Sequence, residues 1–173
     1  MRADSELEKS YTVEVQVGEQ FKAQAEPDLL RRAALATLIH QRMEGPCELV
    51  VVLSDDTELH ELNLHYRGVD APTDVLAFPY GGEGETHETF VSAPGTPRYL
   101  GDVIISFRRA EVQAAEVGHS VQAELQLLVV HGVLHLLGYD DVADKQRARM
   151  WTAQAEILQG LGVKVHLPED TSL

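Results

Sequence analysis

The sequence lacks the features that mark secreted and membrane proteins. Its 173 residues include a single cysteine, Cys47, so no intrachain disulfide can form, which fits a reducing compartment. Residues 1–9 are charged and contain no apolar stretch, so we expect no signal peptide. The most apolar segment, residues 125–137, is too short to cross a bilayer. These absences predict a cytoplasmic protein with no membrane partner.

Positive charge is also scarce. The sequence has 14 Lys and Arg residues against 28 Asp and Glu residues, a formal net charge of −14. Because phosphate binding depends mainly on Lys and Arg, this balance taken alone argues against a nucleic-acid partner. Ten of the 14 cations are arginines, however, and several stand close together, at positions 31–32, 108–109, 147 and 149. The sequence leaves open whether these arginines converge into a basic cleft.

The length and composition are those of one globular domain, with 44% hydrophobic and 24% charged residues. We expect a mobile charged tail over residues 1–10, the domain over 11–165 and a polar tail over 166–173. Residues 80–99 are rich in Gly, Glu, Thr and Pro and show no hydrophobic period. This composition predicts a long loop, a feature that is often functional or disordered.

Hydrophobic periodicity predicts an alternation of strands and helices. Strands are expected at 11–17, 47–53, 74–78 and 100–106, and helices from 27 to about 43, from 55 to about 65, and over 107–119, 121–137 and 142–160. Asp55 and Ser120 are predicted helix N-caps. The segment 121–137 is apolar nearly all round, which indicates a central, buried helix. A short strand-like piece is expected after residue 163.

Two histidines, His131 and His135, stand four residues apart near the end of this central helix. Residues at i and i+4 share a helix face, so both imidazoles can hold one metal ion. Gly138 favours a helix end there, after which the chain can return and bring Asp140 or Asp141 to the metal as a third ligand. Three protein ligands and one open position make the catalytic form of a zinc site.

Such a site predicts metal-assisted hydrolysis, because bound zinc lowers the pKa of its water to about 7 and polarises carbonyl or phosphoryl oxygens. In zinc proteases a Glu directly follows the first histidine and acts as general base, whereas here that position is Gly132. Peptide hydrolysis is therefore disfavoured. The glycine leaves room either for a substrate beside the metal or for close helix packing.

Two residues near this site have competing interpretations. Asp141 precedes the helix predicted over 142–160 and is either a metal ligand or the N-cap of that helix. Arg67 ends a predicted helix, where a cation complements the helix dipole. Alternatively, Arg67 lies near the metal and neutralises charge that develops on a phosphate.

Three ordered motifs carry a resemblance to a known family. They are residues 131–140 (HGVLHLLGYD), Tyr66-Arg67 followed by residues 70–79 (DAPTDVLAFP), and residues 100–106 (LGDVIIS). Together they resemble the YbeY family of bacterial endoribonucleases, also called rRNA maturation factors. The resemblance covers roughly residues 48–155. It implies an α+β fold with a small mixed β-sheet packed with helices, and a metal site at the C-terminal end of the central buried helix.

The resemblance also implies a function and a set of site residues. It implies one Zn²⁺ ion per chain, held by His131, His135 and Asp141, and a catalytic Arg67 that contacts the scissile phosphate. The implied activity is single-strand-specific RNA cleavage in 16S rRNA precursor 3′-end maturation and ribosome quality control, with contact to the small ribosomal subunit and no DNA partner. The family usually has a third histidine where this chain has Asp141. Aspartate is a competent zinc ligand, although it makes the ligand set harder and more anionic.

Two other functions stay open. A zinc peptidase would need a general base from elsewhere, and Glu124 lies about two turns before His131, too far along the helix for a confident assignment. A non-catalytic ribosome assembly factor would use the metal only to stabilise its fold.

Overall fold

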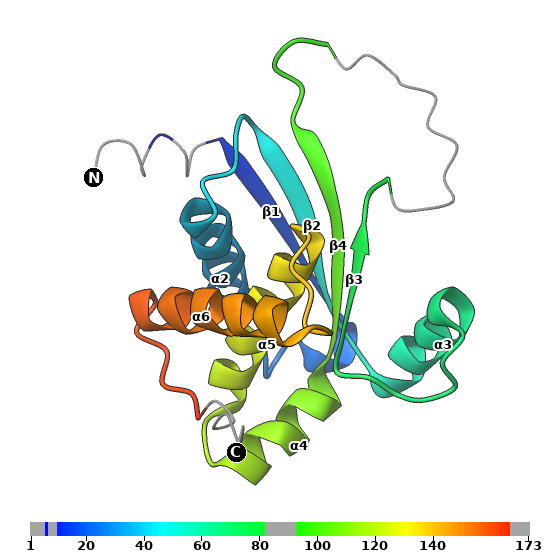
Figure 1. Cartoon of the computed structure of the whole chain (residues 1–173). Helices are drawn as coiled ribbons and strands as arrows, with labels where there is room; N and C mark the ends of the chain where they lie inside the picture. The colour runs from blue at the N-terminus through cyan, green and yellow to red at the C-terminus, as the bar shows by residue number, and fades with distance from the viewer. Residues whose placement is uncertain (1–5, 7–9, 82–92, 167–173) are drawn as a thin grey trace.

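A four-stranded mixed sheet forms the centre of the computed structural model, which describes residues 6, 10–81 and 93–166 (Figure 1). The strands run in the order β1-β2-β4-β3, with β1 parallel to β2, β2 parallel to β4, and β3 antiparallel to β4. They span Tyr11–Val17 (β1), Cys47–Ser54 (β2), Val75–Pro79 (β3) and Arg98–Ser106 (β4). The predicted α+β class with a small mixed sheet is confirmed.

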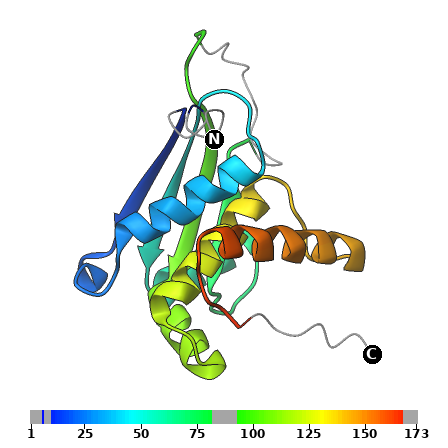
Figure 2. The same ribbon diagram turned by 90° about the vertical axis from the view of Figure 1, so that its left-hand side faces the viewer.

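Helices cover one face of this sheet in two layers. The helices span Pro27–His40 (α2), Asp56–Arg67 (α3), Phe107–Val117 (α4), Val121–Leu136 (α5) and Asp144–Gly160 (α6), with a short 3-10 turn at Glu19–Phe21 (η1). α2 and α5 pack on the sheet, and α6 packs outside them (Figures 1 and 2). α3 lies beyond the edge of the sheet that β3 forms, and it contacts β3, β4 and α4. Among the described residues, none of these helices has the length and apolar character that crossing a bilayer requires.

Local sequence signals set where these helices begin. Asp55 accepts a hydrogen bond from Glu58 N–H (2.9 Å) and Ser120 accepts one from Ala123 N–H (3.1 Å), which confirms both as N-caps. α5 buries 11 of its 16 residues, so it is the central helix that its uniform apolar pattern predicts.

Several predicted boundaries differ from the structure by one to three residues, and two of these differences have a clear physical cause. α2 ends at His40 rather than near residue 43, because Arg42 takes a left-handed backbone conformation (φ 51°) that an α-helix excludes. β4 begins at Arg98, inside the predicted long loop. Its N–H donates a hydrogen bond to the Pro46 carbonyl (2.8 Å), which extends the pairing with β2.

The strand-like piece expected after residue 163 is not found in the described residues. Residues 163–166 form no strand, and Val163 N–H instead donates to the Leu158 carbonyl (3.0 Å) at the end of α6. Most of the two predicted tails, 1–10 and 166–173, lies outside the described residues, as do residues 82–92 of the predicted loop.

α5 approaches the sheet closely at Gly132. A Cβ atom there would lie 2.4 Å from Val103 Cγ1 on β4 and 3.1 Å from Val75 Cγ2 on β3. Val103 is fully buried and β-branched, so it has little freedom to move aside. Of the two uses predicted for this glycine, close helix packing is the one that the structure shows, because the two valines already fill the space.

We predict that Gly132→Ala lowers the free energy of unfolding by about 1–3 kcal/mol, because the added methyl overpacks the helix–sheet contact. Gly160→Ala is the matched control, since nothing lies within 4 Å of a Cβ at that position. It should leave stability unchanged or raise it by up to about 1 kcal/mol. Urea unfolding of both variants measures the difference, and equal stabilities would contradict the role given to Gly132.

Candidate metal centre

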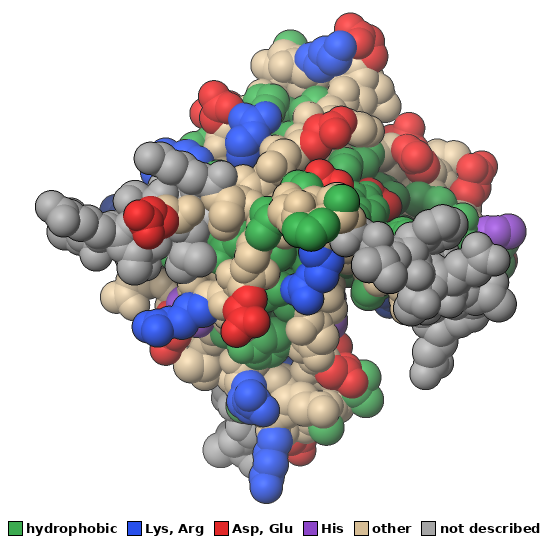
Figure 3. Space-filling view, turned by 90° about the horizontal axis from the view of Figure 1, so that it is seen from above, with side chains coloured by type: hydrophobic (Ala, Val, Ile, Leu, Met, Phe, Trp, Pro, Cys, Tyr) green, Lys and Arg blue, Asp and Glu red, His purple; other side chains and the backbone are tan. Residues whose placement is uncertain are grey.

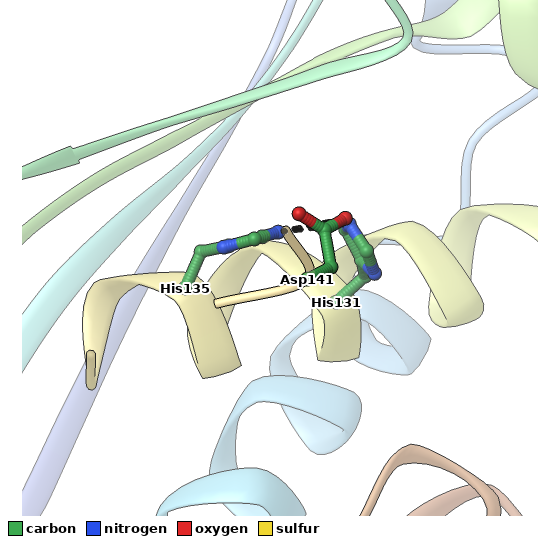
Figure 4. A group of neighbouring side chains, drawn as sticks. All are labelled: His131, His135 and Asp141. Carbon is green, nitrogen blue, oxygen red and sulfur yellow. Dashed lines mark hydrogen bonds and ion pairs between the residues drawn. The ribbon is translucent and has the colours of Figure 1, made fainter. Parts of the chain in front are cut away.

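The two histidines and Asp141 meet at the C-terminal end of α5. His131 and His135 project from the same face of the helix, and the Asp141 carboxylate reaches back over them from the connection to α6 (Figure 4). The chain can return because Gly138 takes a left-handed conformation (φ 96°), and Tyr139 N–H donates to the Leu134 carbonyl (3.0 Å). This is the helix stop that the glycine predicts.

The three side chains present one ligand atom each within a small volume. Nε2 of His131 lies 3.1 Å from Nε2 of His135, which lies 3.8 Å from Oδ2 of Asp141. All three ligand atoms lie within 4.8 Å of one another. Two atoms bound to one tetrahedral zinc ion at about 2.0–2.1 Å would be ~3.3 Å apart, so the spacing suits a shared ion.

Each imidazole faces a hydrogen-bond acceptor at its Nδ1 atom. His135 Nδ1 lies 3.0 Å from the Tyr139 carbonyl oxygen, and His131 Nδ1 lies 3.1 Å from Oε1 of Gln154 on α6. Both partners are acceptors, so both Nδ1 atoms carry a proton and both Nε2 atoms carry lone pairs. Two lone pairs that face each other repel, and a cation between them removes the repulsion. The donor set, two imidazoles and a carboxylate, fits zinc.

Burial keeps His131 in the form that binds metal. Desolvation lowers the pKa of His131 below its ordinary value of 6.5, and the charge of His135 lowers it further. The hydrogen bond to Gln154 and the carboxylates of Asp74 and Asp141 act in the opposite direction. The imidazole is therefore neutral near pH 7, and a metal ion meets little competition from protons.

The two neighbouring aspartates have different surroundings. α6 begins at Asp144 with Ala143 as its N-cap and no side-chain cap, so the interpretation of Asp141 as the N-cap of this helix is wrong. Asp140 instead accepts a hydrogen bond from Val142 N–H (3.0 Å), a local Asx turn. The Asp140 carboxylate is therefore used in a local hydrogen bond within the connection between α5 and α6. The Asp141 carboxylate faces the histidines.

Arg67 lies on a different element from this cluster. It is the last residue of α3, exposed, and followed by Gly68 in a left-handed C-cap conformation (φ 68°). Within the described part of the chain, no hydrogen bond or ion pair joins its guanidinium to the three clustered residues. Its place at a helix C-terminus fits the helix-dipole interpretation, and its catalytic role stays a prediction.

The grouped arginines do not form an unpaired basic patch. They lie on three helices, α2, α4 and α6, and most face carboxylates. The pairs are Arg31 with Asp28, Arg108 with Glu111, Arg109 with Asp56 and Arg147 with Asp144. On the face drawn in Figure 3, Lys and Arg side chains are likewise interspersed with Asp and Glu. Much of the positive charge is therefore offset locally.

Sequence reasoning missed two side chains at this site, Gln154 and Asp74. Gln154 orients His131, and the Asp74 carboxylate raises the pKa of the same imidazole. A signal existed for Gln154, because it is a buried polar residue on the apolar face that Met150, Ala153 and Ile157 define on α6. No such signal existed for Asp74, which lies just before β3.

Comparison with known proteins shows which family this chain resembles. The family model described as Endoribonuclease YbeY matches residues 12–162. A protein of that name from Chloroflexus aurantiacus is 50% identical over 154 residues, 88% of this chain and 97% of its own. One from Roseiflexus sp. is 46% identical over 153 residues, 88% of this chain and 94% of its own. The solution structure of TM1509 from Thermotoga maritima shares the fold, with a TM-score of 0.52 at 24% identity over 91% of this chain and 99% of that one.

We predict that Asp141→Ala weakens zinc binding by at least about tenfold, since it removes one of three protein ligands. Asp140→Ala is the matched control, because it removes a neighbouring carboxylate whose hydrogen bond is local. It should keep one zinc per chain and lose only about 1 kcal/mol of stability. Metal content by mass spectrometry, with competition against a chelator, measures both. If Asp141→Ala kept its full zinc content and Asp140→Ala lost zinc, Asp140 and not Asp141 would be the third ligand.

Proposed function

Because the chain belongs to the Endoribonuclease YbeY family, we propose that it is a zinc-dependent endoribonuclease that cuts single-stranded RNA. The observation that carries this proposal is the close approach of the Nε2 atoms of His131 and His135 (3.1 Å), with the Asp141 carboxylate beside them. A membership that spans residues 12–162 supports RNA as the substrate class.

In this proposal His131, His135 and Asp141 hold one zinc ion and leave one coordination position open. When bound, the ion supplies a water of lowered pKa and polarises a phosphoryl oxygen. The chain's own groups prepare the ligands. Gln154 and the Tyr139 carbonyl hold the two rings, and burial keeps His131 neutral. Such outer hydrogen bonds orient metal-bound histidines and increase their basicity.

We assign Arg67 to contact with the scissile phosphate. Its guanidinium is exposed and has no hydrogen bond or ion pair among the described residues, so its donors are available to a ligand. A guanidinium binds phosphate through two parallel hydrogen bonds. The motif around Arg67 supports the same role, and an RNA strand that spans α3 and the end of α5 would bring both parts of the site together.

We extend the proposal to 3′-end maturation of the 16S rRNA precursor and to ribosome quality control on the small subunit, in the cytoplasm. The resemblance of the three motifs supports this extension. The charge of −14 supports it indirectly, because an acidic protein binds RNA weakly without specific contacts. Substrate choice would then depend on the local site and on the ribosome.

The peptidase alternative has little support from the site. Gly132 stands where a zinc protease carries its general base, and it packs on the sheet. Glu124 accepts a hydrogen bond from His119 and lies about 10 Å before His131 along the helix axis. Neither position provides a carboxylate beside the clustered ligand atoms.

We predict that the zinc-loaded protein cleaves a single-stranded oligoribonucleotide, leaves its duplex form intact, and loses activity with a chelator. Arg67→Ala should cut the rate by at least about tenfold while keeping its zinc, because it removes a donor that stabilises transition-state charge. Arg32→Ala is the matched control, since Arg32 is also exposed and has no hydrogen bond or ion pair among the described residues.

Assays with fluorogenic RNA and with casein distinguish the nuclease, the peptidase and the structural metal. A His135→Ala preparation assayed in parallel detects contaminating nuclease. Cleavage of casein alone would support a peptidase. Loss of folding on chelation without cleavage of either substrate would support a structural metal. If Arg67→Ala and Arg32→Ala lowered the rate of RNA cleavage equally, the proposed contact of Arg67 with the scissile phosphate would be wrong.

A further inference from the structure

A cavity of about 530 Å³ opens beside the candidate metal centre, and His131 is one of its lining residues. Residues of α4, α5 and α6, together with Asp74 just before β3, line it. His131 and Gln154 belong to both the cavity wall and the candidate metal centre. The volume is that of a small-molecule site. A ligand in this cavity would therefore touch the same imidazole that faces the metal.

One wall of the cavity is apolar and carries the only tryptophan of the chain, Trp151. Trp151 is half-buried on α6, and Leu127 and Leu128 of α5 and Ala148 and Ala155 of α6 extend the apolar wall. An indole that is partly open to a cavity is a stacking platform for a planar ring.

Two further lining residues, Asp74 and Glu124, are fixed hydrogen-bond acceptors. Asp74 accepts from Val75 N–H (2.8 Å) through Oδ1 and from the Gln113 amide (3.1 Å) through Oδ2. Each carboxylate oxygen has a further lone pair available. The local bonds therefore hold Asp74 in place while it can still accept a hydrogen bond from a ligand.

Glu124 is held in the same way. His119 Nδ1 accepts a hydrogen bond from His166 N–H (3.1 Å), so its Nε2 carries the proton and donates to the Glu124 carboxylate. The side chain of Glu124 is 6% exposed and lines the cavity. Glu124 thus presents a second buried, oriented acceptor.

The negative charge of the cavity lining favours a nucleobase over a phosphate group as its occupant. Among the described residues, two carboxylates and no Lys or Arg line the cavity, so it repels a phosphate group. A nucleobase matches it better, because the ring stacks on the indole while amino groups on its edge donate to the carboxylates. Glu124 lies about 10 Å from His131 along the helix axis. That distance is comparable to the reach of a nucleotide from its phosphate to the far edge of its base.

We propose that this cavity is a nucleobase subsite in which Trp151 stacks the base next to the scissile phosphate and Asp74 and Glu124 select bases that carry an exocyclic amino group. The inference rests on the proposed RNA substrate. It adds a preference for adenine, cytosine or guanine over uracil, whose carbonyl oxygens would face the carboxylates. A site built from buried polar groups discriminates strongly against a ligand that leaves them unpaired.

The fluorescence of Trp151 tests this subsite without any catalytic step, because no other tryptophan contributes to the signal. Cytidine and uridine are the matched probes, since both are pyrimidines and differ at the amino-bearing edge. We predict that cytidine and adenosine quench Trp151 and that uridine needs at least about tenfold more nucleoside for equal quenching. Glu124→Gln keeps the shape of the side chain but replaces one acceptor oxygen by an NH2 donor. It should therefore reduce the difference between the cytidine and uridine concentrations that give equal quenching.

Cleavage of oligo(A), oligo(C) and oligo(U) gives the second readout. Trp151→Ala should lower kcat/KM about tenfold on oligo(A) and oligo(C) with zinc content unchanged, and Trp151→Phe should restore most of it. Tyr80→Ala removes an exposed aromatic outside the cavity lining and should match the wild type.

The outcomes separate this inference from the proposed function. Quenching by cytidine without cleavage of any RNA would support the subsite and count against the nuclease. RNA cleavage with equal quenching by both pyrimidines, or with none, would overturn the subsite alone. Quenching by an arginine-containing peptide but by no nucleoside would assign the cavity to a protein side chain and overturn it as well.

Discussion

α5 can lie against β3 and β4 only because Gly132 has no side chain, and the rest of the molecule is arranged around that contact. The helix is buried on nearly all sides, so its position fixes α2, α6 and the sheet relative to one another. The two histidines flank this part of the helix. A shift of α5 away from the sheet would therefore move both imidazoles, and the packing of the core sets the geometry of the metal centre.

Imidazole groups on such a helix need polar partners, because an unpaired polar group in a protein interior is destabilising. His131 finds its partner on α6, in Gln154, and His135 finds one in the Tyr139 carbonyl just after the helix. Each bond uses Nδ1 and leaves Nε2 directed at the other ring. The same hydrogen bonds that satisfy the buried rings thus create two lone pairs that a cation can join, which links folding to metal binding.

Local patterns in the sequence predicted what depends on neighbouring residues. The strand and helix order, the N-caps Asp55 and Ser120, and the shared face of His131 and His135 all follow from short-range spacing. Contacts between residues that are far apart in the sequence could not be predicted from such local patterns. β4 starts at Arg98 because of a bond to the β2 side of the sheet, and the orienting role of Gln154 depends on packing across 23 positions. The spacing of Asp140 and Asp141 left their roles open, and only the start of α6 at Asp144 in the structure removed the N-cap interpretation.

Arg67 and the clustered ligands come from motifs that are far apart in the sequence, and the fold sets them on different elements, α3 and the end of α5. We propose that the cluster itself holds the catalytic ion. Anomalous diffraction at the zinc edge from a zinc-soaked crystal tests it most directly. We predict one strong peak bonded to Nε2 of His131, Nε2 of His135 and a carboxylate oxygen of Asp141. A peak at other residues, or no ordered peak between the two imidazoles, would contradict the account.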